Sequence, residues 1–208
     1  MAREDERLTV KIHRVTGTPA HPVEHHFEYA NTYVRERLDT GVERLRIGLR
    51  GGHSVVLRVL GAALAPPYRL LYLLHTTGIG APLGRYESPD LDGPDIESFS
   101  HRFGRFLAED ARHDVWLHSM TDEGGTLVLD RFNMVYAFGP LEKFERILDG
   151  GGIQAVAEWA APQVPYPHAL HYHREWDAAE REILEAFEWQ RTPLHSEDVQ
   201  FWSGPQAT

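Results

Sequence analysis

The stretch from Asp114 to Gly139, DVWLHSMTDEGGTLVLDRFNMVYAFG, constrains the fold more than any other part of the chain. Three short runs within it, Val115 to Ser119, Thr126 to Asp130 and Met134 to Phe138, are rich in β-branched and aromatic residues. The segments MTDEGG and RFN between them supply the polar residues and glycine that turns need. We therefore expect three consecutive antiparallel strands, a central β-meander over about 114–139.

A helix is predicted directly before the meander. Pro94 stands where a first helical residue is expected, and aromatic and aliphatic residues then recur at helical spacing through Asp110. The apolar stripe predicts that this helix covers one face of the meander.

The rest of the chain mixes strand and helix patterns. Strands are predicted at 8–15, 43–50, 68–77 and 85–87, helices at 27–38, 141–148, 153–160 and 177–190, and residues 53–64 fit either. This mixture predicts an α+β fold, a mostly antiparallel sheet packed by several amphipathic helices. We expect residues 1–208 to form a single domain with a loosely ordered C-terminal tail from about residue 193.

Composition narrows the classes of function. The formal net charge of −10 disfavours nucleic-acid binding, which usually needs a surplus of Lys and Arg on one face. No apolar run approaches the roughly 18 residues of a membrane helix, so we expect a soluble, cytoplasmic protein without a membrane partner. Because the chain has no cysteine, any metal would have to bind through His, Asp or Glu.

The segment HALHYHREWD, residues 168–177, contains the strongest chemical pattern. On an extended backbone His171 and His173 point to the same face, and Glu175 joins them if the strand continues. Two imidazoles and a carboxylate are typical ligands of zinc, iron or manganese. His75 and His118, each near the end of a predicted strand, are candidates to complete such a site.

This segment has two interpretations. His-x-His followed by an acid resembles the first metal motif of the cupins over a few residues, although the flanking glycines and the second motif of that family are missing here. The alternative is an edge strand whose polar side chains face water, since a chain with 13 histidines brings some of them together by chance. In that case no cofactor is expected.

His118 and Asp130 are the candidate catalytic residues, because a His/Asp pair can act as acid and base. They share a face of the first hairpin if it pairs in a suitable register, which the sequence does not fix. Turn geometry alone also explains an Asp between two strands.

Residues 43–50, ERLRIGLR, alternate arginine with aliphatic side chains. We expect a half-buried strand whose arginine face is solvated.

These patterns favour a small acidic protein that binds or interacts with a protein partner, because no complete catalytic signature is present. The alternative is a metal-dependent enzyme of hydrolase or oxygenase type. It would use the His-x-His-x-Glu strand and a bound water, assisted by His118 or Asp130.

Overall fold

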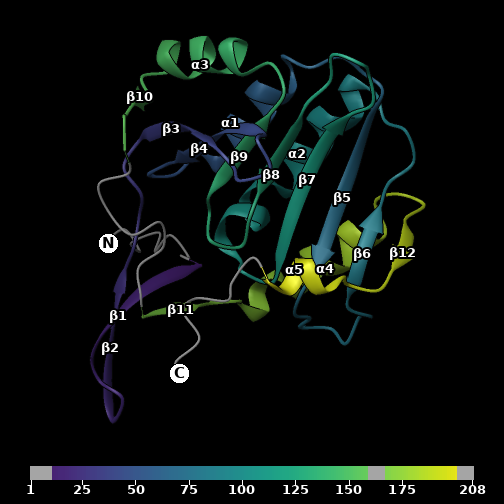
Figure 1. Cartoon of the computed structure of the whole chain (residues 1–208). Helices are drawn as coiled ribbons and strands as arrows, with labels where there is room; N and C mark the ends of the chain where they lie inside the picture. Colours follow the sequence, from purple (N-terminus) through teal and green to yellow (C-terminus); the bar gives the residue numbers. More distant parts are fainter. Residues whose placement is uncertain (1–10, 159–166, 201–208) are drawn as a thin grey trace, which may run out of the picture.

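The computed structural model describes residues 11–158 and 167–200 (Figure 1). The strands are β1 (Ile12–Thr18), β2 (His21–His26), β3 (Thr32–Arg37), β4 (Glu43–Gly48), β5 (Tyr68–Leu74), β6 (Gly84–Glu87), β7 (His113–Ser119), β8 (Thr126–Leu129), β9 (Val135–Phe138), β10 (Gln154–Ala155), β11 (His168–Leu170) and β12 (Gln190–Thr192). The helices are α1 (His53–Gly61), α2 (Gly93–Glu109), α3 (Leu141–Gly150), α4 (Asp177–Leu184) and α5 (Ser196–Gln200), with a single 3-10 turn η1 (Arg174–Trp176).

The strands form two sheets. The large sheet has nine strands in the order β10-β3-β4-β9-β8-β7-β5-β6-β12, and the small sheet has the order β11-β1-β2. Only β10 and β3 pair in parallel among the described strands. The predicted α+β fold with a mostly antiparallel sheet is confirmed, and β9, β8 and β7 are the three middle strands of the large sheet.

Helices lie on one face of the large sheet. In Figure 1, α1 and α2 lie behind β7, β8 and β9, and among the described helices only α5 lies at the front of these three strands, at their lower end. α2 packs on β7, as the apolar stripe predicted, and α1 packs on β8. Leu117 and Leu127 of the sheet and Phe103 and Phe106 of α2 are almost completely buried in this shared core.

The start of α2 is encoded locally. The Asp92 carboxylate accepts a hydrogen bond from the Asp95 backbone N–H at 3.0 Å, and the Asp95 carboxylate accepts one from the Asp92 N–H at 3.0 Å. This reciprocal capping box, with Pro94 in the first turn, satisfies N–H groups that have no partner within the helix.

Three segments that were predicted to be helical differ from that prediction: two contain a strand, and the third forms a shorter helix. Residues 27–38 contain strand β3, because Tyr33 and Val34 are buried while the chain pairs with β4, and this burial outweighs the helical spacing. Residues 153–160 contain β10, which joins the edge of β3, and 159–160 lie outside the described residues. The last long helix ends at Leu184 rather than near residue 190, where β12 pairs with β6.

The C-terminal segment contains one more short helix. Residues 196–200 form α5, and the carboxylate of Asp198 makes an ion pair with Arg85 of β6. Phe201 and Trp202, expected in a loose tail, lie outside the described residues. Within the described part of the chain, no helix is long and apolar enough to span a membrane.

Candidate functional site

A pocket opens on the face of the large sheet that the helices leave uncovered. Its volume is about 330 Å³. It is lined by Arg44, Asp114, Trp116, Thr126, Val128, Asp130, Arg131, Phe132, Tyr136, Phe138 and Asp198. The strands β4, β7, β8 and β9 therefore supply its floor, and α5 contributes one side chain at its edge.

The floor follows from the strand register. Trp116 pairs with Val128, and Val128 pairs with Tyr136. Residues directly opposite each other in an antiparallel sheet point to the same face. The intervening residues, such as Leu117 and Leu127, point into the core on the other side. The same alternation that builds the core thus leaves aromatic side chains on the uncovered face.

Arginine forms one rim of this pocket. The Arg44 guanidinium lies 4.4 Å from the ring centre of Tyr136 and 5.9 Å from that of Phe138, and it makes a 2.7 Å ion pair with Glu36. Arg46 contacts the same Glu36 at 3.5 Å but is only 4% exposed. The expectation of a solvated arginine face is therefore wrong for Arg46, because neighbouring side chains enclose it.

Two carboxylates lie at the other end of the pocket. Asp114 Oδ2 is 2.8 Å from Nε2 of His75, and Asp114 Oδ1 accepts a 2.7 Å hydrogen bond from the Arg131 backbone N–H. Asp130 Oδ1 accepts two 2.8 Å hydrogen bonds, from the backbone N–H groups of Phe132 and Met134. This leaves Asp130 Oδ2 without a hydrogen-bond partner among the described residues.

The environment of Asp130 favours its protonated form. Burial raises the pKa of Asp130, and the nearby charge of Asp114 raises it further. Lys11 lies behind Asp130, where its ammonium group donates hydrogen bonds to the backbone oxygens of Leu107 at 2.9 Å and Asp130 at 3.0 Å. Burial lowers the pKa of Lys11, so Lys11 and Asp130 are both shifted toward their neutral forms.

The structure separates the two predicted catalytic residues. His118 pairs with Thr126 and its Nδ1 lies 2.8 Å from the Thr126 hydroxyl, at the opposite end of the hairpin from Asp130. His75 and Asp114 lie at the Asp130 end instead. The turn prediction is confirmed, because Asp130 caps the turn and Asn133 adopts a φ of 60°.

Sequence patterns missed Lys11. It is one of only two lysines in a chain whose other basic residues are arginine, and it lies within a segment predicted to be a strand. The rarity of lysine in this chain was the sequence signal that Lys11 occupies a specific position in the structure. Its complete burial depends on packing that the sequence does not display.

The predicted histidine strand is shorter than expected. β11 ends at Leu170, and Glu175 lies in the 3-10 turn η1. The extended alternation that would have placed Glu175 beside the two histidines therefore does not occur, and His75 contacts Asp114 instead. His171 and His173 do lie side by side, with stacked rings whose centres are 6.3 Å apart. His171 contacts Glu24, and the backbone N–H of His173 donates to Asp110 at 2.8 Å.

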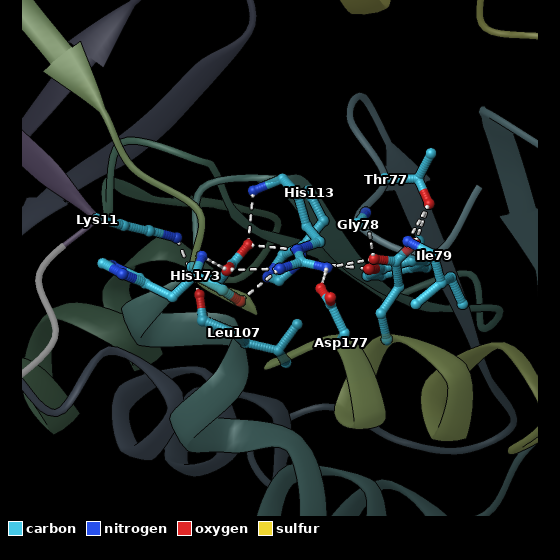
Figure 2. A network of polar contacts seen from close by, with 12 residues as sticks. Lys11, Thr77, Gly78, Ile79, Leu107, His113, His173 and Asp177 are labelled. Carbon is cyan, nitrogen blue, oxygen red and sulfur yellow. Dashed lines mark hydrogen bonds and ion pairs between the residues drawn. The ribbon is translucent and has the colours of Figure 1, made fainter. Parts of the chain in front are cut away.

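A buried polar network fixes this segment to the core. Arg112 is completely buried, and its guanidinium makes two hydrogen bonds to the Asp110 carboxylate, at 2.7 Å and 3.0 Å. It also donates to Glu180, to Asp177 at 3.0 Å and to the backbone oxygen of His173 at 2.9 Å. Figure 2 shows Lys11 and His173 on one side of this network and Thr77, Gly78 and Asp177 on the other. The network holds α4 and η1 against the start of β7.

Comparison with known proteins finds no match to a family model, to a curated protein or to a solved structure. Function has therefore to be inferred from the geometry of the pocket and of the side chains around it.

Proposed function

We propose that this protein binds a small neutral aromatic molecule in the pocket on the uncovered face of the large sheet. One observation carries this proposal: a cavity of about 330 Å³ has aromatic walls and a single carboxylate oxygen that no described residue uses. The sequence favours a binding protein with a protein partner. The present proposal keeps the binding function but assigns it a small-molecule ligand.

The size and walls of the pocket favour one or two aromatic rings. Ligand pockets commonly measure roughly 300–1,000 Å³, so this one lies at the small end of the range. Trp116, Tyr136 and Phe138 offer ring faces and edges. Aromatic pairs gain stability from stacked and edge-to-face contacts beyond the area that they bury.

The charges around the pocket favour a neutral ligand. Asp198 is ion-paired with Arg85, which lies outside the pocket lining. Arg44 is likewise ion-paired with Glu36, which also lies outside the lining, so the lining retains Arg131, Asp114 and Asp130. Because Asp130 is shifted toward its neutral form, the opposite charges of Arg131 and Asp114 cancel, and neither an anion nor a cation gains from the pocket as a whole.

Asp130 defines the polar contact. Its Oδ2 accepts a hydrogen bond from a ligand hydroxyl or amine, and this bond is charge-assisted when the carboxyl is ionised. A pocket with such an acceptor discriminates against an analogue that lacks the donor, because the acceptor is then buried without a partner.

A pair of probes tests the proposal. 2-Naphthol carries a donor, and its methyl ether has nearly the same shape without one. In a protein-observed NMR titration, 2-naphthol is expected to shift amide signals of residues 114–116 and 128–136, and the ether to bind at least about tenfold more weakly. Equal affinities, no binding, or shifts that map elsewhere would contradict the proposal.

A further inference from the structure

Two side chains of the β1–β2 hairpin and one from the segment after β11 meet on one face of the small sheet. In the β1–β2 pair His13 lies opposite His26 and Val15 lies opposite Glu24, so His13 and Glu24 project to the same side. His171 follows directly after β11, and its backbone N–H donates to the Lys11 oxygen at 2.9 Å. This bond extends the pairing of β11 with β1 by one position.

The potential ligand atoms of these residues converge. One ring nitrogen of His13, one of His171 and one carboxylate oxygen of Glu24 all lie within 4.8 Å of one another. His171 Nε2 is 2.6 Å from Glu24 Oε2, and the rings of His13 and His171 meet edge to face with centres 4.6 Å apart. Among the described residues, no other group of three or more such side chains comes together in this way.

One ring nitrogen in this group is unexplained by the protein alone. Nδ1 of His13 is buried and has no hydrogen-bond partner among the described residues. A buried polar atom without a partner is destabilising, so such atoms often indicate a missing ligand or ion.

The geometry points to a binding site for a divalent transition-metal ion, formed by His13, Glu24 and His171, with zinc as the reference metal. Two imidazoles and one carboxylate form a known three-ligand zinc set, whose fourth position is taken by water or another ligand. Zinc bonds of about 2.1 Å require ligand atoms roughly 3 to 4 Å apart, so small side-chain rotations suffice here. Glu24 and His171 are 42% and 35% exposed, which leaves the site open to solvent.

This site differs from the ligand set expected from the sequence, in which His171 was joined by His173 and Glu175. It is also independent of the proposed pocket, because none of its three residues lines that pocket. Failure of one proposal therefore leaves the other standing.

Calorimetric titration of the untagged full-length protein with zinc tests the inference. We expect one zinc per chain, and at least about tenfold weaker binding in Glu24→Gln and in His171→Asn. Both side chains are partly exposed, so these variants should stay folded, which circular dichroism checks. Magnesium, which prefers oxygen ligands, should give no comparable heat.

His25→Asn is the matched control. His25 lies next to Glu24 on β2 but on the opposite face, where its Nε2 is 2.8 Å from the Thr16 hydroxyl. This variant should bind zinc as the wild type does. No zinc binding by the wild type, unchanged binding in Glu24→Gln and His171→Asn, or an equal loss in His25→Asn would overturn the inference.

Discussion

His171 and Glu24 lie within hydrogen-bonding distance, 2.6 Å between Nε2 and Oε2, although 147 residues separate them in the chain. The contact joins the segment after β11 to the β1–β2 hairpin. Two residues further along the chain, His173 is tied to the buried Arg112 network. The segment from His171 to Asp177 thus connects the small sheet to the core of the large one.

The Arg112 network should be essential for stability. Arg112→Met removes the cation between Asp110 and Glu180, both of which are completely buried. Breaking a buried ion pair in this way costs about 3–5 kcal/mol of unfolding free energy. Urea unfolding measures the loss.

An exposed ion pair provides the control for that experiment. Arg102 and Glu182 are 54% and 51% exposed and lie 2.9 Å apart. Arg102→Met should therefore cost less than about 1 kcal/mol. Similar losses of unfolding free energy in Arg112→Met and Arg102→Met would show that the buried network contributes no more to stability than an exposed ion pair.

Gly78 should tolerate no larger side chain. A Cβ atom at this position would lie 2.0 Å from Asp177 Oδ1 and 2.9 Å from Arg112 Nη1, and both groups are held by the network. We expect Gly78→Ala to lower the free energy of unfolding by about 1–3 kcal/mol. Thermal or urea unfolding measures this loss. Gly93→Ala is the control: a Cβ atom at position 93 would have no other atom within 4 Å, so this variant should cause no such loss.

The fold was predictable where local signals agreed with packing. The capping box, Pro94 and the aromatic stripe all indicate α2, and the meander has β-rich runs separated by turn residues. The helix prediction for residues 27–38 was wrong because four apolar residues in this segment happen to fit a helical spacing. Its pairing with β4 places Tyr33 and Val34 in the core, and such long-range pairing decides the structure.

The site was less predictable because it depends on strand register. Asp130, His75 and Asp114 are recognisable as chemical groups in the sequence, but only the pairing of β5, β7 and β8 brings them to the same end of the sheet. The same register moves His118 to the other end. No sequence pattern marks His13 and Glu24 as ligands, since their only signal is their proximity to His171 in space.

Asp130 should make stability depend on pH. Burial, with a contribution from Asp114, raises its pKa from 3.8 to about 7, so the folded state holds this proton more tightly than the unfolded state. The stability that the protonated carboxyl contributes is full below about pH 4 and is lost as the pH rises through about 7.

Asp130→Asn tests this dependence, because asparagine cannot ionise but keeps an oxygen for the N–H groups of Phe132 and Met134. Between pH 4.5 and pH 7.5 the wild type should lose on the order of 1 kcal/mol or more relative to the variant. Urea unfolding at both pH values measures the difference. Parallel pH profiles would show that Asp130 ionises as easily in the folded protein as in the unfolded chain.

The binding proposal is tested most directly by filling the pocket. Val128→Trp places an indole at the centre of the pocket floor, and Val55→Trp makes the same change at a 51% exposed position on α1. The measurement is the Kd for 2-naphthol in the wild type and in both variants, with circular dichroism to confirm folding. We predict binding by the wild type, a loss of at least about tenfold in Val128→Trp, and a Kd within about twofold of the wild type in Val55→Trp. No binding by the wild type, or wild-type affinity in Val128→Trp, would contradict the assignment of this pocket as the binding site.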